Sequence, residues 1–266
     1  MLSRYNYFRP IVVGTTSNFH PIDTSLFVVK TFFLLCILLF QINLDAKDKY
    51  YLIGSLRTLP QAINFEVGYK YILEKKSSNL LLSQNFTYRV FASISGDLGL
   101  EASYSPSPLF TIFAGKSKTY RFYENIDYNC DSVKCDGVLD RFHKGLSFQF
   151  KWNRFFGQAR YSEMDISIKD FDGIFLVEGL NLLASGAKDK EFEKRLILGT
   201  ELQNSKKIFF LNLKNQVRNT GNNSEANYIV FESPVWGWVS RSAVGIYRSN
   251  VFKTSGSVFL NFERQY

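Results

Sequence analysis

The chain has 266 residues and a formal net charge of +8, from 32 Lys and Arg against 24 Asp and Glu. Its basic residues are scattered, with no cluster and no basic helix, so the excess charge favours a solvated surface over a nucleic-acid partner. Aromatic residues make up 17% of the chain, including 26 Phe and 15 Tyr, which suits aromatic belts at two membrane interfaces.

The first recognisable element is an apolar run of nine residues, Phe32 to Phe40, which follows Lys30. One positive charge before a short apolar run is the pattern of a signal peptide. A membrane-spanning helix needs about 20 apolar residues, more than twice the length of this run. We therefore predict a signal peptide over residues 30–46, with cleavage after Ala46.

Residues 1–29 are polar and mixed and have no place in such a leader. We expect that translation starts near Val28 or Val29, and the alternative is a genuine disordered extension. Residues 47–266 are then the mature protein, which is long enough for one domain.

Apolar and polar residues alternate repeatedly in this mature part. Between residues 63 and 73, one set of alternate residues is apolar and the other is polar or Gly: Ile63, Phe65, Val67, Tyr69, Tyr71 and Leu73 against Asn64, Glu66, Gly68 and Lys70. The pattern recurs at 146–152 and 209–214. Because side chains on a strand alternate between its two faces, each such segment predicts a strand with one apolar and one polar face.

Twelve strands account for the alternation: 50–58, 62–73, 80–94, 98–105, 109–122, 140–152, 155–168, 195–204, 207–218, 226–233, 236–249 and 255–266. Every second connection is short, and the two longest, near 123–139 and 169–194, fall on the same side. An even number of two-faced strands with this rhythm predicts an antiparallel up-and-down transmembrane β-barrel of about 12 strands, with the long connections as outer loops.

The segment 174–184 lacks clean alternation, and Leu176, Leu180 and Leu183 fall at helical spacing. We predict a short helix inside an outer loop, with an extra strand as the alternative. Aromatic residues flank the predicted periplasmic turns, and we expect an aromatic girdle there of Trp152, Phe155, Trp236 and Trp238.

The chain ends in a strand whose alternate residues are Gly256, Val258, Leu260, Phe262, Arg264 and Tyr266. With this ending, residues 50–266 resemble the bacterial outer-membrane β-barrel proteins as a class, although Arg264 departs from the apolar alternation. The resemblance implies an outer-membrane location, contact with outer-membrane lipid, and recognition of the C-terminal strand ending in Tyr266 by the barrel-insertion machinery. A soluble lipocalin-like barrel is the alternative fold, with its apolar face inward.

His143 is the single histidine of the mature part, and its phase predicts a lumen position near the outer rim. Some outer-membrane lipid hydrolases use a His-x-Ser pair on one strand. Here Ser147 is four residues away, about 13 Å along a strand, which is too far for proton transfer. We expect no enzymatic activity, with a His143-based lipid hydrolase as a minor alternative.

Cys130 and Cys135 lie close together in the first long loop, which predicts a disulfide in an exported protein. The pair has no third or fourth Cys or His ligand, so zinc is disfavoured. The neighbouring acidic residues match no calcium-loop spacing: Asp127, Asp131, Asp136 and Asp140. We expect no metal and no cofactor.

The predicted lumen-facing polar residues carry both signs: Glu66, Lys70, Arg89, Glu101, His143, Lys151, Arg160, Glu201, Lys214, Arg218 and Glu263. Such a mixture predicts internal ion pairs around at most a narrow pore, because a ring of one sign is what indicates ion selectivity. We therefore expect a narrow channel or ligand conduit for small solutes. The alternative is a non-conducting structural barrel whose outer loops bind an extracellular ligand or partner.

Overall fold

The computed structural model describes residues 45–58, 62–75, 83–121, 130, 133–169, 171–177, 182–250 and 254–266. The predicted signal peptide at 30–46, apart from its last two residues, and the segment 1–29 lie outside the described residues. No helix in the described ranges is long and apolar enough to cross a membrane.

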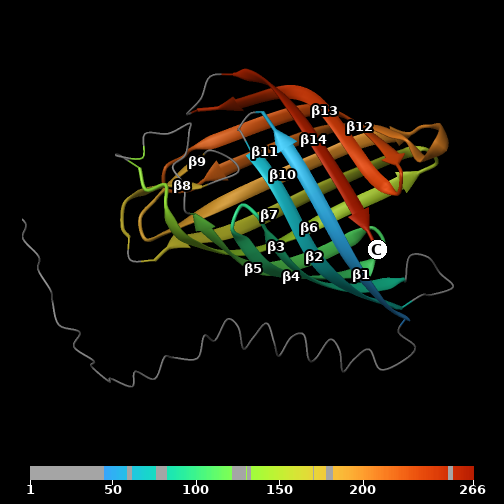
Figure 1. Ribbon diagram of the computed structural model, residues 1–266, viewed down its shortest axis with the longest axis horizontal. Helices are drawn as coiled ribbons and strands as arrows, with labels where there is room; N and C mark the ends of the chain where they lie inside the picture. The colour runs from blue at the N-terminus through green and yellow to red at the C-terminus, as the bar shows by residue number, and fades with distance from the viewer. Residues whose placement is uncertain are drawn as a thin grey trace, which may run out of the picture. The chain divides into compact units, whose positions relative to one another are not determined.

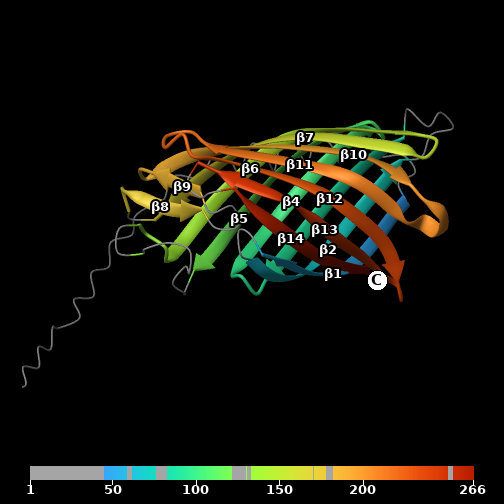
Figure 2. The same ribbon diagram turned by 90° about the horizontal axis from the view of Figure 1, so that it is seen from above.

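The described residues form fourteen strands. In chain order these are β1 (Asp45–Arg57), β2 (Ala62–Lys75), β3 (Gln84–Ser93), β4 (Asp97–Ser107), β5 (Phe110–Arg121), β6 (Gly137–Trp152), β7 (Phe155–Ile168), β8 (Ile174–Val177), β9 (Leu182–Ser185), β10 (Lys188–Glu201), β11 (Lys207–Val217), β12 (Asn223–Val235), β13 (Trp238–Ser249) and β14 (Ser255–Gln265). Twelve of them close into one antiparallel barrel (Figures 1 and 2). The predicted fold class is confirmed.

Sequence neighbours pair throughout the barrel, and two connections complete it. Strand β14 returns to β1, with Gln265 opposite Tyr51, so the barrel has no free edge. Strand β7 pairs directly with β10, which excludes β8 and β9 from the barrel wall. Successive strands run in opposite directions, so the start of β1 and the end of β14 share the end of the barrel that carries the short turns at 153–154 and 236–237.

The helix predicted within 174–184 is wrong. Strands β8 and β9 form a separate two-stranded sheet in which Phe175 lies opposite Ala184 and Val177 opposite Leu182. These four side chains are buried. Leu176 is buried as well, on the other side of β8, and this hid the alternation in the sequence. Because neither strand pairs with a strand of the barrel, the even number of barrel strands is preserved.

An apolar surface surrounds the outside of the barrel. Every barrel strand contributes an exposed apolar side chain on its outward face: Leu56, Val67, Val90, Leu100, Ile112, Phe148, Tyr161, Leu198, Phe210, Ile229, Val244 and Val258. A closed barrel leaves no unpaired backbone donors or acceptors at an edge, so such a surface can lie in hydrocarbon.

Four strands begin further toward the outer end than expected, and β10 differs most, beginning at Lys188 instead of residue 195. The additional residues of β10, 188–194, have charged side chains on both faces of the strand, so this segment shows no alternation of apolar and polar residues. Lys190 on the outward face pairs with Glu163 and, at 3.2 Å, with Asp165. Exposed ion pairs of this kind indicate that these strand ends extend above the apolar surface into water.

The inside of the barrel differs between its two sides. On the β10–β14 side, apolar and aromatic side chains pack together, and the buried members are Phe209, Ala226, Tyr228, Val230, Ala243 and Tyr247. On the β2–β7 side, the inward residues are mainly polar or charged. The packed side fills part of the lumen, so any continuous polar path through the barrel follows the other side.

Candidate functional site in the barrel lumen

A cluster of charged side chains occupies the middle of the lumen, on strands β2 to β7. Glu101 lies at its centre, with His143 Nε2 at 3.0 Å and Arg160 Nη2 at 3.7 Å. Arg89 lies directly opposite Glu101 on the neighbouring strand and approaches Glu66 at 3.9 Å. Five strands, β2, β3, β4, β6 and β7, therefore bring these side chains together, although they are far apart in the sequence.

Gly115 makes the contact between His143 and Glu101 possible. It lies between them on β5, opposite Glu101 on one side and His143 on the other. A Cβ atom at this position would lie 2.5 Å from His143 Cε1 and 2.5 Å from the Leu100 carbonyl oxygen. The imidazole crosses the strand through the space that a side chain would fill. In the sequence, the signal for this contact is a Gly at an inward-facing position between two strands that carry inward-facing charged residues.

Aromatic rings support the two arginines of the cluster. The guanidinium carbon of Arg89 lies 4.6 Å from the Phe91 ring centroid, and that of Arg160 lies 3.9 Å from the Phe113 centroid. Such cation–π contacts hold a guanidinium in place without neutralising its charge. The Nε atoms of both arginines are buried and have no hydrogen-bond acceptor among the described residues.

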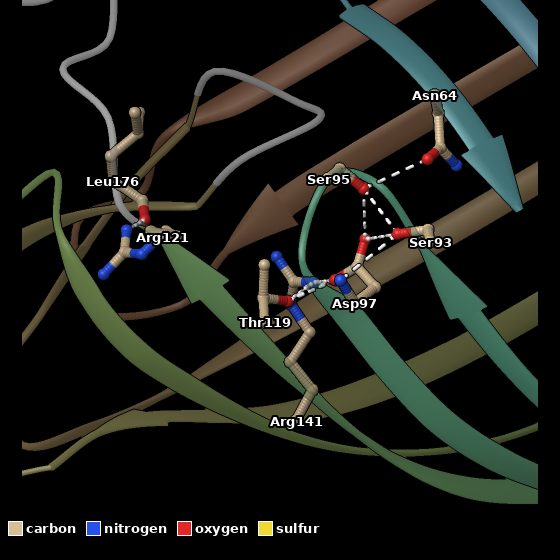
Figure 3. A network of polar contacts seen from close by, with 8 residues as sticks. All are labelled: Asn64, Ser93, Ser95, Asp97, Thr119, Arg121, Arg141 and Leu176. Atoms are coloured by element: carbon tan, nitrogen blue, oxygen red, sulfur yellow. Dashed lines mark hydrogen bonds and ion pairs between the residues drawn. The ribbon is translucent and has the colours of Figure 1, made fainter.

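A second polar network lies nearer the outer end and is centred on Asp97 (Figure 3). Arg141 Nη1 lies 3.3 Å from Asp97 Oδ1 and donates to Thr119 Oγ1 at 2.6 Å, and Thr119 donates to the same carboxylate. Ser95 donates to Asp97 Oδ2 at 3.0 Å or to Asn64 Oδ1 at 3.1 Å. The network links β2, the β3–β4 turn, β4, β5 and β6 into one rigid rim.

The β8–β9 hairpin covers the lumen beyond this rim. Phe175, Val177 and Leu182 pack against inward-facing apolar residues at the outer ends of β6, β7 and β11, namely Leu139, Ile166, Ile168 and Val217. Figures 1 and 2 show the hairpin at the end of the barrel opposite the C-terminus. On β6, β7 and β11, the inward-facing side chains thus become apolar where the hairpin packs on them.

Hydrogen bonds hold the hairpin at both sides. The buried guanidinium of Arg121, at the end of β5, donates to the Leu176 carbonyl oxygen at 2.6 Å (Figure 3). It also donates to the Asp136 carbonyl oxygen at 2.9 Å. On the other side, Thr220 Oγ1 donates to the Leu183 carbonyl at 2.6 Å. The hairpin is therefore anchored from β5 and from the β11–β12 turn.

The segment before β6 joins the hairpin directly. Lys134 N donates to the Ile174 carbonyl at 3.0 Å, and Leu176 N donates to the Lys134 carbonyl at 3.1 Å. The sulfur atoms of Cys130 and Cys135 face each other, with Cα atoms 5.6 Å apart. Lys134 Nζ lies 2.8 Å from Asp136, and this hydrogen bond lowers the pKa of the Asp136 carboxyl.

Ion pairs line the inner end of the lumen. Lys151 Nζ lies 2.8 Å from Glu201. Arg241 lies between Glu232 at 2.7 Å and Glu263 at 3.0 Å, and Lys207 approaches Glu232 at 2.7 Å. The β6–β14 side of this end is thus neutralised by its own pairs.

Among the predicted lumen residues, the structure places two elsewhere. Lys214 lies opposite Glu225 on the outward face, where the two side chains pair at 3.3 Å. Arg218 follows the end of β11 and is exposed. In β11 the apolar residues Phe209, Leu211 and Leu213 face inward, so the expectation of a polar inward face fails on this strand.

The other predicted residues lie on inward-facing positions, and the polar contacts of the lumen also involve residues that the sequence did not single out. These are Tyr51, Asp97, Gly115, Thr119, Arg121, Arg141, Glu232 and Arg241. Tyr51 OH, for example, donates to Glu66 at 2.9 Å. Trp152, Phe155 and Trp238 lie beside the turns at 153–154 and 236–237, and Trp236 lies in the second turn; Trp152 and Trp236 are strongly exposed.

The arrangement contains no recognisable catalytic or metal centre in the described ranges. No group of three or more His, Cys, Asp or Glu side chains there is placed to hold a metal ion. His143 bonds Glu101, whereas Ser147 Oγ accepts from Gln158 Nε2 at 3.2 Å. That the protein has no enzymatic activity stays a prediction.

The decisive combination is a closed barrel with an apolar outside and charged side chains inside. A soluble lipocalin-like barrel would have the opposite arrangement. The fold is that of a transmembrane β-barrel. Its polar outer strand ends, its aromatic residues at the short turns and its terminal strand agree with that class.

No protein-family model and no curated protein sequence matches this chain. Several solved barrels have a similar architecture. OmpT, an outer membrane protein of Vibrio cholerae in its trimer form, is 7% identical, with a TM-score of 0.43, over 85% of this chain and 100% of that chain. The β domain of the Bordetella autotransporter BrkA is 9% identical, with a TM-score of 0.40, over 82% and 98% of the two chains.

The KdgM porin in complex with disordered oligogalacturonate is 9% identical, with a TM-score of 0.38, over 81% of this chain and 98% of that chain. At such low identities and TM-scores, the assignment to the class rests on the geometry of this barrel and not on these neighbours.

Proposed function

We propose that the barrel is a narrow conduit for small solutes whose outer mouth is covered by the β8–β9 hairpin. The observation that carries this proposal is the contrast in exposure along the lumen. The side chains of Arg89 and Arg160 in the middle are 33% and 27% exposed, whereas Phe175 and Leu182 in the hairpin are 0% exposed. Water reaches the charged cluster but not the hairpin interface.

The inner end supports the same interpretation. The side chain of Lys151 is 58% exposed, so this end of the polar path is accessible. The apolar packing on the β10–β14 side confines the path to the β1–β7 side, which limits its width. A conduit of this shape favours small solutes over large ones.

A second candidate is a non-conducting barrel whose outer surface binds a partner. The tight packing of the hairpin and its anchoring by Arg121 and Thr220 favour this candidate, because both stabilise a closed mouth. In that case the hairpin and the Cys130–Cys135 loop are the surface presented to the outside.

We also propose the processing and assembly steps that the sequence predicts. These are removal of a signal peptide at 30–46, formation of the Cys130–Cys135 disulfide, and insertion through recognition of the C-terminal strand. Arg264 does not oppose such recognition, because its guanidinium lies over the rings of Trp238 at 5.7 Å and Tyr266 at 4.7 Å. This arrangement supports a membrane-interface position for the strand end.

Planar-bilayer recording tests the conduit. We expect the purified barrel to show small, infrequent openings, and a variant in which a Gly-Ser linker replaces residues 174–185 to conduct continuously. The replacement leaves all twelve barrel strands intact, and heat-modifiable migration on a gel verifies that the variant folds. A folded variant without conductance would refute the conduit and favour the non-conducting barrel.

A further inference from the structure

The charges on the two sides of the lumen are not equally compensated. On the β6–β14 side, the cations Lys151, Arg195, Lys207 and Arg241 each lie within 2.7–3.1 Å of a carboxylate oxygen. On the β1–β3 side, the register places Lys49 opposite Lys70, and Lys70 opposite Arg89. Three inward-facing cations on three adjacent strands therefore form one row.

This row contains little negative charge. Among the described residues, neither Lys49 nor Lys70 forms an ion pair, and Lys49 Nζ donates to the neutral Gln265 side chain at 3.4 Å. Arg89 is 3.9 Å from Glu66, whose carboxylate accepts a shorter hydrogen bond from Tyr51. Glu101, at the end of the row, is shared with His143 and Arg160.

Like charges at facing positions of adjacent strands destabilise a sheet unless something compensates them. Arg89 is nonetheless held in place by the Phe91 ring, and its buried Nε has no acceptor among the described residues. The three cations of the row therefore face the polar path with fewer close carboxylates than the cations of the opposite side: Glu66 lies 3.9 Å from Arg89, and, among the described residues, Lys49 has only the neutral Gln265 side chain at 3.4 Å.

We infer that the Lys49–Lys70–Arg89 row binds small solutes that carry two or more anionic groups, such as carboxylates. Adjacent strands are about 4.8 Å apart, so the row spans roughly 10 Å, which is more than one carboxylate covers. A solute with several anionic groups can neutralise the positive charges of all three side chains as it moves along the β1–β3 side of the lumen. This inference rests on the proposed conduit, because it names the class of solute that the conduit takes.

Two measurements on the refolded full barrel test the inference separately from the conduit. The first is titration calorimetry in detergent at low salt with citrate, and with glycerol as the neutral comparison. The second is the reversal potential across a planar bilayer under a KCl gradient, which reports the preference for chloride over potassium.

The test variant is Lys49→Gln/Lys70→Gln, and the matched control is Lys144→Gln/Lys194→Gln. The control removes the same charge from exposed positions on the outward face of β6 and β10. We expect the test variant to bind citrate at least about tenfold more weakly and to lose anion preference. The control is expected to leave both unchanged, and heat-modifiable migration verifies that each variant folds.

The outcomes separate the two proposals. Citrate binding that depends on the row, in a barrel without conductance, supports the anion site and refutes the conduit. Conductance without anion preference or citrate binding supports the conduit and refutes the anion site. Equal loss of citrate binding in both variants also refutes the site, because general charge then explains the binding.

Discussion

Truncating Phe175 to Ala should release the hairpin from the barrel. Phe175 is 0% exposed and packs among Leu139, Ile166, Ile168 and Val217. Removing a buried Phe side chain typically costs about 3–5 kcal/mol. The cost falls on the docking of the hairpin, because β8 pairs with β9 and with no strand of the barrel wall. Since each 1.4 kcal/mol is a factor of about ten, the ratio of docked to undocked hairpin should fall by roughly two to three and a half powers of ten.

The neighbouring residue supplies the control. Ile174 lies on the same strand but is 47% exposed, so Ile174→Ala should leave docking nearly unchanged. Planar-bilayer recording and protease digestion of intact vesicles are the assays. We expect Phe175→Ala to raise both the open time and cleavage within 174–185, with heat-modifiable migration preserved. If the two variants behave alike while both remain folded, the hairpin does not close the lumen and the reasoning fails.

Three further predictions concern the outer loops and the terminal strand. A membrane-impermeant thiol reagent should label Cys130 and Cys135 on whole cells only after reduction; labelling without reductant would exclude the bridge. Arg121→Met should weaken hairpin docking by about 1.5–3 kcal/mol for each lost charge-assisted hydrogen bond, seen as faster proteolysis of the hairpin; unchanged proteolysis would show that Arg121 does not anchor it. Deleting Tyr266 should lower the fraction of heat-modifiable barrel recovered from outer membranes, and full recovery would rule out a role in insertion.

The strand layout could be predicted because the side-chain period of a strand is a local property. Wherever one face meets lipid and the other meets the lumen, as between Leu146 and Trp152, the alternation appears directly in the sequence. The alternation is lost where the two faces of a strand do not differ in polarity in this way. Between Lys188 and Lys194 both faces are charged, and in β11 Phe209, Leu211 and Leu213 face inward against the packed side of the lumen.

The alternation of β8 is also absent from the sequence, and for a related reason the pattern there indicates a helix. In β8 both faces are buried, so Leu176 breaks the alternation that Phe175 and Val177 keep. No short-range pattern distinguishes such a strand from one turn of an amphipathic helix. Its structure depends on the apolar inner surface formed by Leu139 and Ile166, which lie far away in the sequence.

By itself, the sequence determined the membrane class of the barrel, its number of strands, the side on which the long loops lie and most of the residues that face the lumen. These follow from alternation and turn spacing. Only the tertiary structure decided which lumen residues meet, because that depends on register across strands. The register places Gly115 between Glu101 and His143. It also places Lys49 opposite Lys70, and Lys70 opposite Arg89. The packing of the hairpin on the outer ends of the strands likewise appears only in the folded barrel. Contacts across strands are set by the closure of the whole sheet, which no single segment encodes.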